Sequence, residues 1–447
     1  MILLAGMPAA ALAQTLEAAL AAAYMNNPGL RAERASLRAT DERVPQALAN
    51  WRPDVEVTSD IGRADTFNST RTGKRDQMRT PRGLELNVTQ PLFRGFRTRA
   101  ATREARNTVK AARARLLAKE QDVLLEAASA FMNVVRDQAV VELNINNERF
   151  LKRQLEAVSD RFEVGELTRT DVSQAEARLA GATAERIQTK GDLEASRAAY
   201  RKVIGEEPGT LIQPKPLGGL PAGREEAISR AIEYHPDVIA ASFDIRAARA
   251  NMDEIRGELL PSLELTGKVS RRFESAGNSS RVDEKSIKAT LTIPLYQQGV
   301  VRSRLRAARQ TVGRERLEED QSRLEVAEAA TRAWEALATA RARIESFTAQ
   351  VAANEIALEG VTREAAVGER TVLDVLDAER ELLDARVDLV GAERDEVVAI
   401  FQLREAIGRL TARHLYLPVD FYDPDVHYRE IQGRGLGGGN GENDANK

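Results

Sequence analysis

The chain of 447 residues contains no cysteine, only three histidines, and few aromatic residues, which make up 4% of it. Without cysteine the chain has no disulfides, no thiolate nucleophile and no cysteine-based metal site. The histidines, His235, His414 and His427, are scattered without the spacing of metal ligands, so we expect surface or packing roles and no metal. A thick globular core is not expected, because Phe, Tyr and Trp bury the most area per residue.

The motifs of common catalytic sites are also missing. The sequence has no G-x-S-x-G, no P-loop and no histidine-rich cluster, so acyl, phosphoryl and metal chemistry all lack necessary groups. Paired acids such as Glu318-Glu319 are the solvated charges of a helix. We therefore predict that the chain is not an enzyme and needs no cofactor.

Long apolar runs are missing as well. No segment after the first residues approaches the roughly 20 apolar residues of a membrane-spanning helix, so any crossing would be made by strands. Met1–Gln14 is an apolar run that ends in Ala11-Leu12-Ala13, a small-residue pattern that precedes signal-peptidase cleavage. We expect residues 1–13 to be a signal peptide, truncated or misplaced at its start because a basic leader is missing. An Ala-rich first helical turn is the alternative.

What is abundant is Ala, Leu, Arg and Glu, a mixture typical of long helices and coiled coils. The 65 basic residues are matched by 68 acidic ones, which leaves a formal charge of −3. A near-neutral chain gives no reason to expect a nucleic-acid partner.

The two halves of the sequence align with each other at a shift of a little over two hundred residues. The shift is kept over whole stretches with small gaps, which predicts two tandem repeats. The matches are Asn27-Pro28 with His235-Pro236, Trp51-Arg52-Pro53 with Leu259-Leu260-Pro261, Gln90–Phe93 with Ile293–Tyr296, Val164-Gly165 with Val367-Gly368, Asp171-Val172 with Asp374-Val375, and Ile204-Gly205 with Ile407-Gly408.

Each repeat has the same predicted elements: a helical segment broken at an X-Pro pair, two strands, and a long helical hairpin. The predicted boundaries are 14–204 for the first repeat (strands 53–62 and 83–93, hairpin 97–204), 205–223 for a Pro/Gly-rich linker, 224–410 for the second repeat (strands 262–272 and 285–296, hairpin 300–410), and 411–447 for a C-terminal tail with a disordered end.

The hairpins are unusually long. Between Gly95 and Gly165 there is neither glycine nor proline, so one helix could extend for about 100 Å. Heptad positions carry Leu117, Leu124, Phe131 and Ile145, and Ala127, Val134, Val141, Leu155 and Phe162. A second stripe, Leu116, Val123 and Ala130, predicts contact with neighbours on two sides. That arrangement suits a closed ring of helices.

The four predicted strands alternate apolar and polar residues over about ten positions, the length of a tilted strand that crosses a bilayer. Soluble hairpins with one buried face are the alternative. The long, charged connections at Arg63–Arg82 and Arg271–Lys285 favour outward loops, and no apolar element is left to cover the strands. Four strands leave two unpaired edges, which a bilayer does not tolerate, so several subunits must share one barrel.

The sequence resembles the TolC-like outer-membrane efflux and type I secretion channels over essentially the whole chain after residue 13. The resemblance is carried by Q-P-L-F-x-G at Gln90–Gly95 and by V-G-x-R-T-x-x-D-V-L-D-A at Val367–Ala378. It implies a mainly α fold with transmembrane β, in which a homotrimer forms a 12-stranded β-barrel continued by an α-helical barrel. It also implies the bacterial outer membrane, with a long periplasmic extension.

Specific roles follow from the resemblance at matching positions. Asp374 and Asp377 match stacked acidic rings at the narrow periplasmic end, which would favour cations. Arg370 and Asp171 match a gate latch. The sequence departs from the best-known members at Ala365, where they carry a tyrosine in the latch.

The tips of both hairpins are also assigned by resemblance. Gly165 and Gly368 match tip glycines that reverse the backbone, and with Val164 and Val367 they match the loops that a periplasmic adaptor protein contacts. A plain helix-hairpin turn with acidic caps is the alternative.

The tail at His414–Ile431 resembles the ending of the type I secretion branch, and Gly433–Lys447 is predicted to be disordered. The implied function is export of polypeptides or small toxic compounds with an adaptor and an inner-membrane ABC or proton-driven pump, in contact with outer-membrane lipid. A non-channel periplasmic coiled-coil scaffold or adaptor is the alternative.

Overall fold

A computed structural model describes residues 14–70, 73–214, 218–277 and 279–432. The predicted signal peptide, residues 1–13, and the predicted disordered end, residues 433–447, lie outside this range. The chain divides into two compact units. The first, called unit 1, takes its described residues from 1–35, 114–239 and 321–422; the second, unit 2, takes them from 36–113, 240–320 and 423–447.

Short helices precede the strands in each half of the chain. They are α1 (Leu16–Asn26), α2 (Pro28–Asp41) and α3 (Arg43–Ala49) in the first half, and α6 (Arg224–Tyr234) and α7 (Pro236–Gly257) in the second. The breaks fall at Pro28 and Pro236, as predicted. The Asn27 Oδ1 accepts hydrogen bonds from the N–H groups of Gly29 and Leu30, and the His235 Nδ1 accepts one from the N–H of Asp237. Both side chains therefore satisfy open donors at a helix start.

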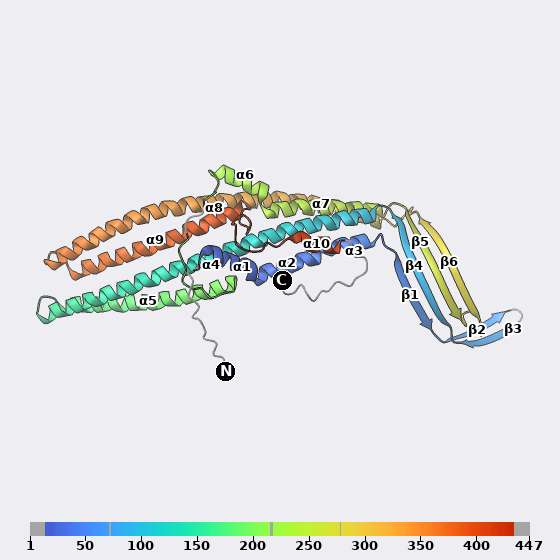
Figure 1. Ribbon diagram of the computed structural model, residues 1–447, viewed down its shortest axis with the longest axis horizontal. Coiled ribbons are helices and arrows are strands. Elements are labelled where there is room, and N and C mark those ends of the chain that lie inside the picture. Colours follow the sequence, from blue (N-terminus) through green and yellow to red (C-terminus); the bar gives the residue numbers. More distant parts are fainter. Residues whose placement is uncertain (1–13, 71–72, 215–217, 278, 433–447) are drawn as a thin grey trace, which may run out of the picture. The chain divides into compact units, whose positions relative to one another are not determined.

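In unit 2, four antiparallel strands form one sheet in the order β1–β4–β5–β6 (Figure 1). Their bounds are β1 (Asp54–Ile61), β4 (Arg82–Arg94), β5 (Ser262–Phe273) and β6 (Arg281–Thr292). The strand pair contributed by each half of the chain meets the other pair between β4 and β5. The edge strands are β1 and β6.

The two faces of this sheet differ in polarity. In register, Leu86 lies opposite Val57 and Val269, and Val88 lies opposite Val55 and Gly267, so apolar side chains share one face. Apolar residues on this face are exposed, with Val57 65% and Ile287 82% accessible. On the opposite face the Glu85 carboxylate is 2.9 Å from the Lys268 Nζ and 2.8 Å from an Arg272 nitrogen.

The structure differs from two expectations about strands. The connection after β1 contains a further ribbon, β2 (Ala64–Thr70) paired with β3 (Gly73–Arg79), where a polar loop was expected. Its composition carries no apolar alternation, so sequence gave no strand signal. The last strand runs over 281–292 rather than 285–296, because Pro294 lacks a backbone donor and Arg281–Glu284 pair with β5.

The long hairpins consist of α4 (Arg97–Glu163) with α5 (Arg169–Ile204), and α8 (Val300–Ala366) with α9 (Val372–Ala406). At α4, four heptad residues are fully buried: Leu124, Ala127, Phe131 and Val134. The rings of Phe131 and Tyr200 lie 6.5 Å apart within unit 1. Leu117 and Phe162, from the same heptad pattern, are exposed at 44% and 37%.

Two glycines meet where β4 passes into α4. Gly95 has φ of +59°, and a Cβ placed on it would lie 2.3 Å from the carbonyl oxygen of Gly257. A Cβ on Gly257 would in turn lie 2.4 Å from the Gly95 carbonyl oxygen. Both positions therefore need glycine because two backbones touch there.

The tail includes a helix, α10 (Pro424–Ile431), that docks within unit 2. The His427 Nδ1 lies 3.1 Å from a carboxylate oxygen of Asp41, whose side chain is fully buried. Arg113 contacts Asp425 at 2.6 Å and stacks on Tyr428, and the Tyr428 ring packs on a small apolar cluster. Burial raises the pKa of Asp41, and the hydrogen bond with His427 partly offsets this.

We predict that His427→Ala destabilises the docking of α10. The Asp41 Oδ1 has no hydrogen-bond partner among the described protein atoms. Loss of His427 would therefore also remove the hydrogen bond to the other oxygen of this buried carboxyl. The expected cost is about 1–3 kcal/mol. It is measured as a lower melting temperature of the purified protein and faster protease cleavage at α10. The double variant Asp41→Leu/His427→Leu, which leaves neither partner alone, should lose less; an equal loss would contradict this account.

We also predict that stability falls as pH rises because of Glu405. Burial, with the nearby acids Asp122 and Asp237, raises the pKa of Glu405 to about 7. The folded chain thus holds a proton that the unfolded chain releases near pH 4.5, so stability present below that pH is lost as pH rises to about 7. The upper bound is roughly 3 kcal/mol. The melting temperature should fall between pH 5 and pH 8, and less so in Glu405→Gln; equal slopes would exclude Glu405 as the source.

Candidate functional site

The two hairpin turns of unit 1 reverse the chain in the same way. At the first, Gly165 has φ of +84° and its N–H donates to the carbonyl of Phe162 at 2.9 Å. At the second, Gly368 also has φ of +84° and donates to the carbonyl of Ala365 at 3.2 Å. A Cβ at either glycine would meet nothing within 4 Å, so backbone conformation, not space, favours glycine here.

The valines before these glycines point into solvent. Val164 is 73% accessible and Val367 is 74% accessible. Each turn thus presents one uncovered apolar side chain.

Each return helix starts with a capping box. The Asp171 carboxylate accepts hydrogen bonds from the N–H and the hydroxyl of Thr168, each at 2.8 Å, and the Asp374 carboxylate accepts the same pair from Thr371 at 2.9 and 2.8 Å. The threonine hydroxyls accept from the N–H groups of the two aspartates in return. These bonds lower the pKa of Asp171 and of Asp374 below the usual range, so both carry charge at neutral pH.

The two residues of the predicted latch do not meet within one chain. The Arg370 Nε donates to the Glu364 carboxylate at 2.9 Å, across its own turn. The hydrogen bonds of Asp171 go to Thr168. The contact between Arg370 and Asp171 therefore stays a prediction.

Asp377 has a partner that the sequence did not indicate. One of its carboxylate oxygens lies 2.5 Å from the Arg178 Nη2, which joins α9 to α5. Arg178 comes two turns after Asp171, where a basic residue looks like an ordinary exposed charge. No sequence pattern relates residues 199 positions apart in this way.

Apolar contacts hold the two hairpins together beside this pair. Leu376 is buried against Leu151 and Ala182, and Val372 packs against both this cluster and a second one around Val158 and Val172. Residues from α4, α5 and α9 therefore form one packed layer near the turns. A cavity of about 210 Å³ opens next to it, and its lining includes Arg178, Glu185 and Arg380.

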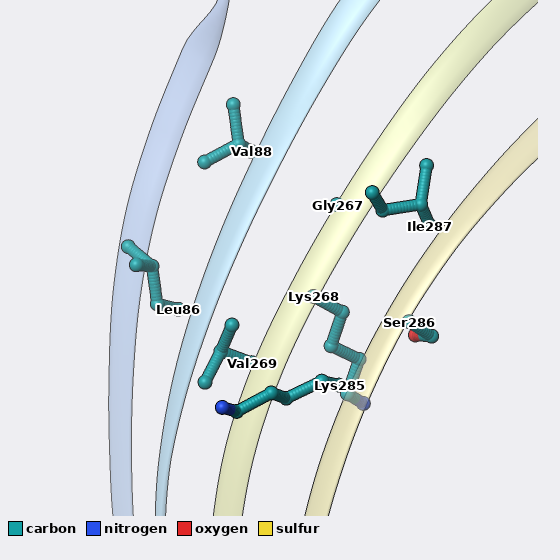
Figure 2. A pocket seen from close by; sticks show the side chains of 8 residues that line it. All are labelled: Leu86, Val88, Gly267, Lys268, Val269, Lys285, Ser286 and Ile287. Carbon is teal, nitrogen blue, oxygen red and sulfur yellow. The ribbon is translucent and has the colours of Figure 1, made fainter.

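A second hollow lies on the apolar face of the sheet in unit 2, shown in Figure 2. It forms where Gly267 provides no side chain between Val88 and Ile287. The next row across the strands is Leu86, Val269 and Lys285. Its lining combines apolar side chains with Lys268, Lys285 and Ser286.

Neither a metal site nor a membrane-spanning helix is found in the part of the chain that the structure describes. No group of three or more His, Asp or Glu side chains there is arranged to hold a metal ion. Across the same residues, every helix is too short or too polar to cross a membrane.

Comparisons with known proteins agree on one family. The family model described as outer membrane efflux protein matches residues 19–206 and 227–409. The outer membrane efflux protein BepC of Brucella suis is 34% identical over 96% of this chain and 92% of its own length. The outer membrane protein TolC of Vibrio cholerae is 26% identical, over 86% and 89%.

A solved structure has the same fold. The outer membrane channel CmeC of Campylobacter jejuni superposes with a TM-score of 0.80 over 94% of this chain and 89% of its own, at 17% identity.

Proposed function

Because the chain belongs to the outer membrane efflux protein family and is an outer-membrane efflux channel, we propose that three copies form the channel. The observation that carries this proposal is the four-stranded sheet with edge strands β1 and β6 and an exposed apolar face. In a bilayer, edge N–H and C=O groups must pair and an apolar face must meet lipid. Three such sheets would close a 12-stranded barrel, which the long hairpins would continue as a helical barrel across the periplasm.

We propose that each subunit is a tandem repeat, with residues 14–204 and 224–410 as the two copies and 411–447 as a periplasmic tail. Support comes from the two separate matches to the family model, at 19–206 and 227–409. The paired geometry of Gly165 with Gly368, and of the two capping boxes, supports the same division.

The gate is proposed to lie at the hairpin turns. Asp374 and Asp377 would form acidic rings where three chains converge, and a ring of carboxylates favours cations. Arg370 of one chain would reach Asp171 of its neighbour when the gate is closed. Val164, Gly165, Val367 and Gly368 would contact a periplasmic adaptor, since both valines are exposed.

The transport partners are proposed to be that adaptor and an inner-membrane ABC or proton-driven pump. The resemblance of the tail at His414–Ile431 favours type I secretion of polypeptides. No catalytic step in the channel is proposed. The alternative, a periplasmic scaffold without a channel, would leave the apolar face of the sheet unexplained.

Asp374→Asn tests both the channel and its constriction. In planar bilayers the wild-type protein should conduct, and a trivalent cation such as cobalt hexammine should block it from the periplasmic side. Removal of one charge per chain should raise the blocking concentration by about tenfold, because the cation loses Coulomb attraction. The control is Asp384→Asn, since Asp384 pairs with Arg380 on the same helix at 2.9 Å. Unchanged block in Asp374→Asn would place the constriction elsewhere.

Arg370→Ser tests the latch between chains. If Arg370 ties neighbouring copies together, the variant should raise the resting conductance several-fold. Arg363→Ser is the matched control, because Arg363 pairs with Glu359 one turn away on its own helix. A resting conductance equal to that of the wild type would assign the latch to other residues.

A further inference from the structure

One ion pair near the hairpin turns joins the return helices of the two hairpins. The Arg178 Nη2 on α5 lies 2.5 Å from an Asp377 carboxylate oxygen on α9. The two side chains are 42% and 52% accessible, so the pair is hydrated and contributes little to folding stability. Its importance therefore lies in where it places charge and which elements it connects.

The position of the pair is set by the apolar layer beside it. Leu376, which precedes Asp377, is 2% accessible and packs with Leu179, which follows Arg178. Because this packing fixes the spacing of α5 and α9, the two charged groups are held within reach of each other. Movement of the two helices away from each other would separate the pair.

Another basic residue on α9 could have paired with Asp377. Arg380 lies three positions further along, a favourable spacing for an ion pair within a helix. It instead contacts Asp384 at 2.9 Å, one turn in the other direction. Asp377 is thus left for Arg178, and the charge on α9 is balanced across the helix contact.

The pair has no counterpart in the other half of the chain. At the shift that aligns Asp171 with Asp374, Arg178 aligns with Glu381, and Asp377 aligns with Gln174. In addition, Ala365 beside the second turn has no polar group with which to link the hairpins. Arg178 and Asp377 are specific additions at the contact between α5 and α9.

We propose that Arg178 is the counter-ion of Asp377 and that this pair links the two hairpins of each subunit in the closed gate. The proposal rests on the channel function and the gate position proposed above. Three arginines then cancel three Asp377 carboxylates, which leaves the Asp374 carboxylates as the main acidic charge at the constriction, with Arg370 bonded to Glu364. When α5 and α9 separate on opening, Asp377 is uncovered, so the open pore attracts cations more strongly.

The experiment compares Arg178→Gln with wild type in planar bilayers, with resting conductance and block by cobalt hexammine as readouts. Uncovered Asp377 should lower the blocking concentration about three- to tenfold, and loss of the link should raise the resting conductance. In the Asp377→Asn background, Arg178→Gln should no longer change the block. Arg178→Lys keeps the charge, so cobalt hexammine should block this variant at the same concentration as the wild type.

Two further variants separate charge from packing. The exchange Arg178→Asp/Asp377→Arg should restore the wild-type resting conductance, because the pair re-forms with reversed polarity. Arg380→Gln is the matched control: Arg380 lines the same cavity but is paired within its own helix. Arg380→Gln should change the blocking concentration by less than about twofold. All variants are first checked for a wild-type oligomer on a native gel, and the lysine and exchange variants keep the test decisive if the glutamine variant fails to assemble.

The outcomes distinguish this inference from the function beneath it. A wild-type protein that does not conduct would overturn the channel itself. If Asp374→Asn leaves the blocking concentration unchanged, the constriction does not lie at the hairpin turns. If Asp374→Asn weakens the block while Arg178→Gln leaves it unchanged, only the present inference is overturned. The inference is likewise overturned if Arg178→Gln lowers the blocking concentration equally in the wild-type and Asp377→Asn backgrounds, because Arg178 would then not be the counter-ion of Asp377.

Discussion

The backbone N–H and C=O groups along the outer edges of β1 and β6 impose the requirement on which the rest of the molecule depends. In the hydrocarbon of a bilayer no water is present to form hydrogen bonds with these groups, and each unpaired N–H or C=O costs several kcal/mol. The same strands expose an apolar face, and contact of that face with water is unfavourable. The proposed closure with further copies in a bilayer would satisfy both demands, and the helices would then follow the symmetry of the strands.

Elements with a strong local signal were predictable. The uninterrupted stretch between Gly95 and Gly165 gave α4, and period-two alternation gave β1, β4 and β5. The ribbon of β2 and β3 was not predictable, because backbone pairing forms it without an apolar pattern. The docking of α10 was missed as well, since it depends on Asp41 meeting His427 from the far end of the sequence.

The site shows the same division between local and distant information. The turns and their capping boxes follow from short patterns, because a threonine, an aspartate three positions later and a preceding glycine define a helix start. The pairing of charges at the site does not follow from short patterns. Asp377 looked like one member of an uncompensated acidic pair until the fold placed Arg178 against it. A charge count from sequence alone therefore overestimates the negative charge at the proposed constriction, because it does not show partners on other helices.

The contact between Gly95 and Gly257 has a consequence for how this protein can vary. Each glycine excludes a side chain at the other through its own carbonyl oxygen, so a larger residue at either position pushes apart the same two backbones. Replacement of one cannot be compensated by change at the other, since neither has any atom left to remove. At this junction between β4 and α4, substitution is therefore excluded in both halves of the chain at once.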